Sequence, residues 1–432
     1  MELASPSKGL SLPTQILLGL VLGAVAGVTL NVLYAPPLGQ PATGTYASVV
    51  AFADGVVKPL GDLFLSLLFM VVVPVVFSSL FLGVAGLGSV GKLGSLGGRT
   101  LLWFLVTTTA AVLLGLLLVN WFEPGRAVSA EVAAQIKAQY AGDASKRIGQ
   151  SQQATGWVQM LVDIVPRNVV AAAADNGKVL GLIFFALVLG AAAIRAPREK
   201  TKPLCDLCVR VLGWVMQLAP YGVACLIFHA TAKLGLDVLK LVSLYFATAM
   251  GGLVVYQLVA ITFLAKACAG LSPGRFYRGC RTLIVTAFST SSSNATLPTT
   301  IRTATDEFGV PKEIAGFVMP LGATMNMNGT ALFEGVSVLF LAQVAGVDLS
   351  LGQQALVVGM AVLTAIGAAG VPGGSLPLLA IVLTQVGVPP EFLALILGVD
   401  RLVDMTRTVP NVTSDLVCSL WLARREGVAL KA

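Results

Sequence analysis

Long apolar runs, separated by short polar breaks, dominate the first part of the chain. A membrane-spanning helix needs about 20 mostly apolar residues, and each of these runs predicts one such helix. The fourth run is short, and we expect it to continue upstream through Asp163–Asn176 as a broken element. The predicted spans are Leu12–Tyr34, Pro59–Leu87, Leu101–Phe122, Val179–Ile194, Leu204–Thr231 and Leu239–Ala265.

The later part of the chain is apolar as well, but each of its segments carries polar or helix-breaking residues. The segments are Thr282–Thr300, Ile314–Val344, Leu356–Val386 and Phe392–Leu422. Serine, glycine and proline interrupt the first and third, and an Asn-Met-Asn-Gly sequence interrupts the second. Paired interruptions of this kind indicate an inverted repeat in which each half supplies a re-entrant loop and a spanning helix. Irregular backbone at membrane depth is tolerated only inside protein or beside a water-filled cavity.

The composition excludes the other fold classes. Of the 432 residues, 56% are hydrophobic and only 11% are charged, against about 25% charged in a soluble domain. The 46 glycines exclude a coiled coil, and the sparse aromatic residues argue against an outer-membrane barrel. We therefore predict an all-α polytopic membrane protein whose surroundings are the lipid bilayer. The net charge of +7 is not a nucleic-acid signal in such a protein.

The distribution of Lys and Arg among the short loops predicts the orientation. The segment Ala35–Val57 has no Lys or Arg, whereas basic residues follow every even-numbered span. Since cytoplasmic loops carry the excess of Lys and Arg, both termini should be cytoplasmic and the protein should lie in a bacterial inner membrane. The polar stretch Glu123–Thr155 is expected to be an external loop. The pair Cys205 and Cys208 has no second cysteine pair or nearby histidine, so we expect no metal or other cofactor.

The last helix carries the most informative polar residues. They recur every three or four positions and therefore form one stripe on an otherwise apolar helix. A charged residue at the centre of a spanning helix costs about 2.5 to 3.5 kcal/mol, so these groups should face one another, a cavity or a ligand. The alternative is an internal ion pair that only joins helices. The stripe consists of Asp400, Asp404, Arg407 with Thr408, Asn411 and Asp415.

This stripe suggests a substrate. The planar guanidinium of Arg407 suits a carboxylate, which it can bind through two donors. Asp404, one turn away, suits an ammonium group. An acidic amino acid satisfies both, and its α-carboxylate then needs donors such as the hydroxyl and N–H groups of Ser291–Asn294.

Other polar residues suggest coupling ions. Asn326, Asn328 and Asp415 offer oxygen ligands to a small cation such as sodium. Glu334 is a second acid inside a predicted span, and burial favours the protonated form of a carboxyl group. Glu334 is therefore a candidate proton carrier, with a hydrogen-bonded structural acid as the alternative.

At this point the sequence resembles the glutamate transporter family, the dicarboxylate/amino acid:cation symporters. The resemblance covers nearly the whole chain and rests on ordered motifs. These are Lys58-Pro-Leu-Gly-Asp-Leu-Phe, Phe69-Met-Val-Val-Val-Pro74, Ser291-Ser-Ser-Asn-Ala-Thr-Leu-Pro298, Asn326-Met-Asn-Gly-Thr330, Gly367-Ala-Ala-Gly-Val-Pro-Gly373 and the helix from Asp404 to Asp415.

The resemblance implies eight spanning helices, two re-entrant helical hairpins, a homotrimer and an elevator-type mechanism. Scaffold helices 1 and 2 would lie within residues 12–98, and scaffold helices 4 and 5, with the external loop, within 124–235. The transport domain would comprise helix 3 (99–123) and the core at 236–426, with helix 6, hairpin 1, helix 7, hairpin 2 and helix 8. The second hairpin would act as a gate.

The resemblance also implies residue roles. Arg407 would hold the side-chain carboxylate of the substrate and Asp404 its amino group. The α-carboxylate and the pocket wall would use Thr408, Asn411, Ser292, Ser293, Thr330 and the Val371 backbone. One sodium site would use Gly322, Asn326, Asn411 and Asp415. Another would lie near Thr324 and Ile366, and a third near Thr107, Thr108, Asn326 and position 328.

The chain departs from the family pattern at several of these positions. Asn328 replaces the acid of the family's Asn-Met-Asp-Gly-Thr motif, and Phe104 replaces an aromatic hydroxyl expected near Thr107, so the third sodium site should be degraded. Glu334 matches the proton-carrying glutamate of the excitatory amino acid transporters. A second arginine of the relatives is absent, because its two known positions hold Ser291 and Met405, and we expect no potassium counter-transport.

We therefore predict a symporter, not an enzyme, that imports glutamate or aspartate with protons and with fewer sodium ions or none. Sodium coupling, a dicarboxylate substrate and a neutral amino acid substrate are alternatives within the same fold. A channel would show flux without coupling to an imposed gradient. An intramembrane hydrolase using Ser291–Ser293 is disfavoured because no histidine or lysine base lies in that region.

Overall fold

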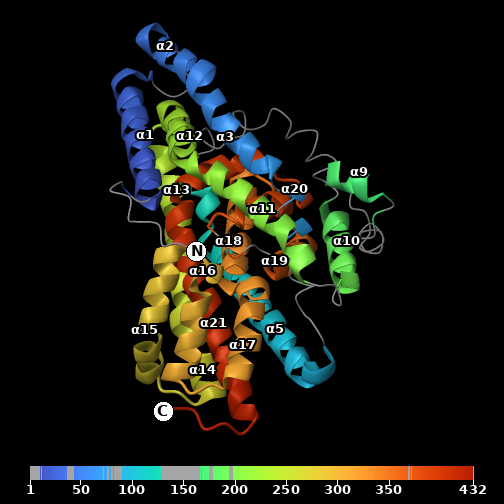
Figure 1. Cartoon of the computed structure of the whole chain (residues 1–432). Coiled ribbons are helices and arrows are strands. Elements are labelled where there is room, and N and C mark those ends of the chain that lie inside the picture. Colours follow the sequence, from blue (N-terminus) through green and yellow to red (C-terminus); the bar gives the residue numbers. More distant parts are fainter. Residues whose placement is uncertain are drawn as a thin grey trace.

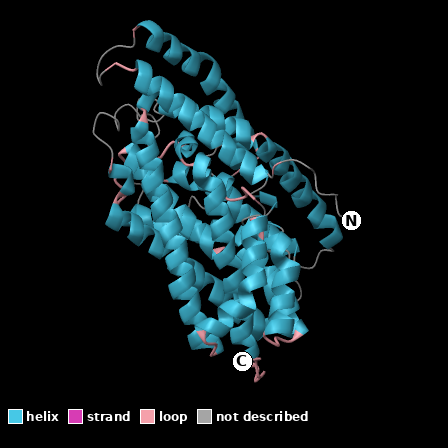
Figure 2. Ribbon diagram, turned by 90° about the vertical axis from the view of Figure 1, so that its left-hand side faces the viewer, coloured by secondary structure: helices cyan, strands magenta, loops and turns pink. Residues whose placement is uncertain are grey.

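The computed structural model describes residues 10, 12–36, 43–71, 73–74, 77–78, 81, 90–127, 166, 168–174, 179–193, 198–367, 370 and 372–431. Within these ranges every regular element is a helix and no strand occurs, as Figure 2 shows. The predicted all-helical class is confirmed. Four helical stretches of the described chain are long and apolar enough to cross a membrane, namely Leu12–Tyr34, Leu96–Arg126, Leu236–Ala269 and Lys312–Ala345. The protein is therefore a multi-pass membrane protein.

The first predicted helix is confirmed, and the second begins earlier than expected. Helix α1 spans Leu12–Tyr34. The next helical stretch comprises α2 (Gly44–Phe52), a π-helical turn η1 (Ala53–Val57) and α3 (Lys58–Met70). The prediction that this helix starts at Pro59 is wrong, because the wider π-helical turn accommodates a proline without ending the helix. Most of the predicted span beyond residue 71 lies outside the described residues.

The middle of the chain contains one long helix and several shorter ones. Helix α5 (Val90–Phe122) contains the predicted third span and is followed by the short turn η2 (Pro124–Arg126). Helices α9 (Val169–Ala174) and α10 (Val179–Ala192) lie within the predicted fourth element, and the residues between them lie outside the described residues. The rest of the expected external loop, and Asp163, lie outside the described residues.

The fifth predicted span is not one helix. It consists of α11 (Arg198–Gln217) and α12 (Ala219–Leu234), which meet at an angle of 51°. Pro220 stands in the first turn of α12, where its missing N–H cannot continue the hydrogen bonds of α11. The sixth span is longer than predicted and comprises α13 (Leu236–Val255), a π-helical turn η5 (Tyr256–Ile261) and α14 (Thr262–Ala269).

The interruptions predicted in the later segments are confirmed. The first separates α15 (Pro273–Thr290) from α16 (Ser293–Arg302) and the turn η6 (Thr303–Glu307). The second separates α17 (Lys312–Met325) from α18 (Asn328–Ala345), and the third separates α19 (Leu351–Gly367) from α20 (Leu376–Gln385). The chain then forms η7 (Pro390–Leu395) and the long helix α21 (Leu397–Arg425).

Helix α21 lies at the centre of this later part of the chain. It packs against α13, α14, α15, α17 and α18, and α18 in turn lies along α5. Nearly every side chain of α18 and most of those of α21 are buried, so α18 and α21 face protein rather than lipid. At the other end of the molecule, α12 lies between α1 and α3 (Figure 1). The breaks at residues 291–292 and 326–327 lie between helices that pack against α21, and Gly373, in the break between α19 and α20, donates its N–H to Asp404 on α21.

Candidate functional site

The polar stripe predicted on the last helix exists and is buried. Asp400, Asp404, Arg407, Asn411 and Asp415 all lie on α21 with at most 4% of their surface exposed. Their spacing of three or four residues sets them on one face of the helix. That face is turned towards the helix breaks described above, where irregular backbone offers polar partners.

Arg407 is held by acids on its own helix. Its Nε and Nη2 atoms donate to Asp404 Oδ1 at 3.0 and 2.6 Å, and its Nη1 atom lies 3.6 Å from Asp400 Oδ1. The guanidinium plane stacks on the ring of Phe333 at 4.3 Å, a favourable cation–π geometry. Nη1 has no hydrogen-bond acceptor in the described part of the chain. One side of a charged, two-pronged donor therefore remains available.

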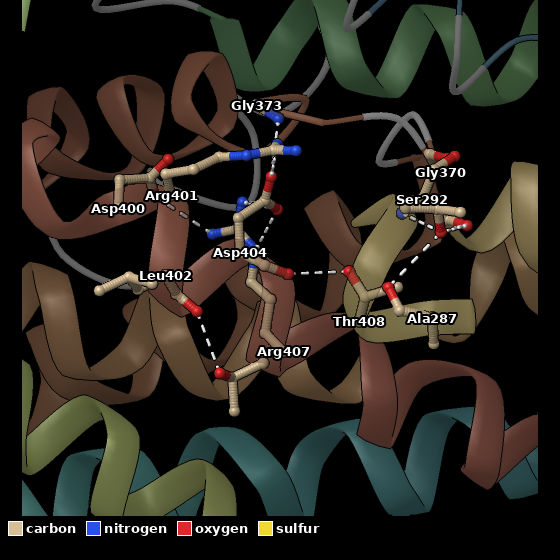
Figure 3. A network of polar contacts seen from close by, with 12 residues as sticks. Ala287, Ser292, Gly370, Gly373, Asp400, Arg401, Leu402, Asp404, Arg407 and Thr408 are labelled. Carbon is tan, nitrogen blue, oxygen red and sulfur yellow. Dashed lines mark hydrogen bonds and ion pairs between the residues drawn. The ribbon is translucent and has the colours of Figure 1, made fainter. Parts of the chain in front are cut away.

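The ion pair does not connect two helices, because Asp404 and Arg407 are both on α21. This geometry argues against the alternative in which the pair serves only to join helices. Asp404 also accepts through Oδ2, from the Gly373 N–H and from Arg401 Nη1, each at 3.2 Å. Figure 3 shows these groups converging on Asp404. Gly373 belongs to the break between α19 and α20, so this break is tied to the stripe.

Arg401 is a buried residue to which sequence analysis assigned no role. It lies three residues before Asp404 and is only 7% exposed. A signal was present, since an arginine in an apolar helix requires a partner. Its spacing from Asp404 equals that of Arg407 on the other side.

Asp404 and Arg407 border a small cavity. Six residues predicted to bind substrate line it, namely Ser293, Thr330, Asp404, Arg407, Thr408 and Asn411. Ser291, which belongs to the serine-rich segment predicted to supply donors, also lines it, and three further lining residues were not predicted, namely Met327, Gly370 and Ser375. The hydroxyls of Ser291 and Ser375 are buried without a hydrogen-bond partner among the described residues. The cavity therefore combines a cation, an anion and free hydroxyl groups.

Ser292 and Val371 stand apart from this lining. The Ser292 hydroxyl donates to the Gly370 carbonyl at 2.5 Å and accepts from the Ala295 N–H at 3.1 Å. It thus caps α16 and joins the two helix breaks instead of reaching the cavity. Ser291 precedes it in the left-handed region at φ 50°, which is uncommon for a residue other than glycine. Val371 lies outside the described residues.

A second polar cluster lies beside the cavity, at the break between α17 and α18. The Asn326 amide donates to Asp415 Oδ1 at 2.7 Å, and a Cβ atom at Gly322 would overlap the same carboxylate. The structure therefore brings together three of the four residues predicted for the first sodium site. The fourth, Asn411, directs its side chain elsewhere, accepting from the Gly329 N–H at 2.7 Å and donating to Thr330 at 3.3 Å.

The residues predicted for the third cation site form a closed hydrogen-bond network. Thr108 donates to Asn328 Oδ1 at 2.7 Å, and the Asn328 amide nitrogen donates to Ser414 Oγ at 2.7 Å. Thr107 Oγ1 lies 3.5 Å from the side-chain oxygens of Asn326 and Asn328. Tyr256 adds an aromatic hydroxyl that donates to the Thr107 carbonyl at 3.1 Å. Phe104 had suggested that no aromatic hydroxyl lies here, and the structure supplies one from a different helix.

The remaining cation candidates are less concentrated. Thr324 is half-buried and its hydroxyl contacts the Leu321 carbonyl at 3.0 Å, while Ile366 is half-buried on the neighbouring helix α19. In the described ranges, no three His, Cys, Asp or Glu side chains approach closely enough to hold a metal ion. The candidate site at Gly322, Asn326 and Asp415 thus offers oxygen atoms with one carboxylate, which suits a hard monovalent cation better than a transition metal.

Glu334 is fully buried on α18 without a basic partner among the ion pairs of the described chain. Its Oε2 atom lies 2.6 Å from the Thr364 hydroxyl, and its Oε1 atom has no partner in this part of the protein. The same hydroxyl lies 2.9 Å from the Met360 carbonyl. Since a hydroxyl has one proton, a protonated Glu334 can donate to Thr364 while Thr364 donates to Met360.

An all-helical membrane protein whose broken helices enclose a buried, charged cavity has the features of a secondary transporter. Comparison with known proteins gives the particular family. The chain matches the sodium:dicarboxylate symporter family over residues 12–425, and it belongs to that family.

Three relatives illustrate the range of the family. The chain is 38% identical to the proton/sodium-glutamate symport protein of Bacillus subtilis (strain 168), covering 96% of this chain and 93% of that protein. It is 35% identical to the proton/glutamate-aspartate symporter of Escherichia coli (strain K12), covering 85% of each. It is 30% identical to the C4-dicarboxylate transport protein of Bacillus subtilis (strain 168), covering 96% of this chain and 94% of that protein.

Proposed function

We propose that this protein is a symporter that imports glutamate or aspartate together with cations. The observation that supports this most directly is the Arg407–Asp404 pair on the cavity wall. An acidic amino acid carries one group for each partner, so it can replace both halves of the pair at once. The names of the glutamate and glutamate-aspartate symporters among the relatives agree with this substrate class.

The bound substrate would use the cavity as follows. Its side-chain carboxylate takes the two-pronged donor of Arg407, and its ammonium group takes Asp404. Its α-carboxylate lies near Ser293, Thr408 and Asn411, with Thr330 and the Val371 backbone beside it. Ser292 supports the site by holding Gly370 at the tip of the α19–α20 break.

In this proposal the import of substrate is coupled to protons, with fewer sodium ions or none. Glu334 is the proton carrier in this proposal, because it is buried, has no basic partner in the described chain and already contacts a hydroxyl that can accept a hydrogen bond from its protonated form. The amide of Asn328 satisfies the neighbouring hydroxyls without a cation. Asp415 with Asn326 and Gly322 remains a candidate for one sodium ion, and Thr324 with Ile366 marks a weaker one.

The architecture proposed for this transport is an elevator. Helix 3 at 99–123 and the core at 236–426 form the moving domain, in which α15–α16 and α19–α20 are two re-entrant hairpins, the second a gate. Residues 12–98 and 124–235 form the scaffold, with eight spanning helices in total and three copies in the assembly. The packing of α18 along α5 and of α12 between α1 and α3 supports this division. The protein lies in the inner membrane with both termini in the cytoplasm.

The test is substitution of Arg407 by threonine. Glutamate and aspartate uptake into proteoliposomes should be abolished, and neutral amino acids such as serine should be admitted. Arg278→Gln, which removes an exposed arginine distant in the sequence from Arg407, is the matched control. Unchanged acidic uptake in Arg407→Thr would refute the assignment of the side-chain carboxylate to Arg407.

A dicarboxylate substrate is the second candidate, since one relative carries the name C4-dicarboxylate transport protein. A dicarboxylate has no ammonium group for Asp404. Competition of labelled glutamate uptake by succinate and by serine separates the acidic amino acid, dicarboxylate and neutral amino acid alternatives.

A further inference from the structure

Asp404 is shared between two arginines, one on each oxygen. Arg407 donates twice to Oδ1, whereas Arg401 Nη1 and the Gly373 N–H donate to Oδ2 at 3.2 Å each. The two guanidinium groups approach the carboxylate from opposite sides (Figure 3). Removing one of them would therefore leave the other in place.

The two arginines differ in their access to the cavity. Asp404 and Arg407 line it, and Arg401 does not. Arg401 is nevertheless buried, and its Nε atom has no acceptor in the described part of the chain. A buried guanidinium requires a compensating charge, and the Asp404 oxygen turned away from Arg407 supplies it. Substrate in the cavity would meet Arg407 and Oδ1, while Arg401 stays behind Oδ2.

We propose that Arg401 is the positioning residue that remains on Asp404 when Arg407 turns to the acidic substrate. This inference rests on the proposed function of the Arg407–Asp404 pair. Arg401 fixes the carboxylate through Oδ2, so that Oδ1 faces the cavity and is ready for the ammonium group. It also balances the buried charges, because the cluster then contains two acids, Asp400 and Asp404, and two arginines.

Loss of Arg401 should weaken the binding of acidic substrates in particular. Among the described residues, Asp404 would then have Arg407 as its only guanidinium partner and would hold Arg407 more strongly against the competing substrate carboxylate. The remaining cluster of Asp400, Asp404 and Arg407 would also carry an excess negative charge, which repels an acidic molecule. Both effects act on substrate affinity rather than on the movement of the loaded transporter.

The experiment measures glutamate uptake by Arg401→Gln in proteoliposomes, normalised to folded protein. We expect KM to rise by about 30-fold or more, the size expected when one partner of a buried charge pair is removed, while the maximal rate stays close to that of the natural protein. Arg401→Lys keeps the charge and should restore most of the affinity. Arg278→Gln is the control for loss of an arginine elsewhere and should leave KM unchanged.

A double variant, Asp400→Asn with Arg401→Gln, guards against misfolding because it removes one acid and one base together. Its KM should also be raised, since Oδ2 of Asp404 still lacks its guanidinium. An unchanged KM with a lower yield of folded protein would overturn the proposal, as would failure of Arg401→Lys to improve on Arg401→Gln. Arg407→Thr is measured in parallel, so that failure of the proposed function is recognised by acidic uptake persisting in that variant.

Discussion

The amide nitrogen of Asn328, at the start of α18, donates to Ser414 Oγ on α21 at 2.7 Å. At the same time its oxygen accepts from Thr108. An amide has both donors and acceptors, so it satisfies its surroundings without a charge. A carboxylate at the same place has only acceptors and would need a cation or a proton.

Asn328→Asp should therefore create a sodium requirement. The new carboxylate would lie beside Ser414, Thr107 and Thr108, a set of hard oxygen ligands that suits sodium. We expect glutamate uptake at low sodium to fall and to recover as sodium is raised. Uptake measured against sodium concentration checks this, with Asn120→Asp on the exposed surface of α5 as the control. A sodium response identical to that of the natural protein would contradict the interpretation of the network.

Glu334→Gln should abolish uptake that is driven by a pH gradient. Glutamine resembles a protonated carboxyl group in shape and charge but cannot release a proton. Exchange of external for internal glutamate should survive, because exchange needs no net proton movement. Proteoliposomes under separate proton and sodium gradients distinguish the two activities. Glu313→Gln, at an exposed acid at the start of α17, is the matched control, and strict sodium dependence together with an unaffected Glu334→Gln would rule out proton coupling through this residue.

Asp404→Asn should lower the affinity for amino acids more than the affinity for dicarboxylates. The ammonium group of glutamate loses its anionic partner, and removing one member of a buried charge pair costs about 2 to 5 kcal/mol. Glutamate affinity should therefore fall by a factor of about 30 or more, while succinate, which has no ammonium group, should lose less. Binding measured on the purified protein provides the comparison. An equal loss for both molecules would mean that Asp404 does not recognise the ammonium group.

Gly329→Ala should destabilise the protein without touching a charged side chain. A Cβ atom there would overlap the backbone carbonyl of Arg407, and a main chain cannot move aside as a side chain can. We expect a loss of about 1 to 3 kcal/mol, typical of overpacking, seen as a lower Tm in detergent. Gly316→Ala, where a Cβ atom would meet nothing within 4 Å, is the control and should be neutral or slightly stabilising. An equal Tm for the two variants would show that α18 and α21 are less closely packed than the structure indicates.

Much of the helical content was predictable because apolar runs of sufficient length have few alternatives in a membrane. The interruptions were predictable for a second reason, which is that Ser, Asn, Gly and Pro inside apolar segments disturb helical hydrogen bonds. The start of the second helix was missed because the π-helical turn η1 comes just before Pro59 and lets the helix continue past this residue. The bend between α11 and α12 was missed because Pro220 lies in a stretch that remains apolar throughout.

The sequence by itself determined that the last helix carries a buried polar stripe, because helical periodicity sets Asp400, Asp404, Arg407, Asn411 and Asp415 on one face. It could not determine which charge pairs with which. Arg407 and Arg401 are both three residues from Asp404, and only the tertiary structure decided that they take different oxygens, with Gly373 joining one of them. Likewise, only the tertiary structure placed Tyr256, on η5, beside Thr107, on α5. Contacts between helices that are distant in the chain leave no local pattern in the sequence.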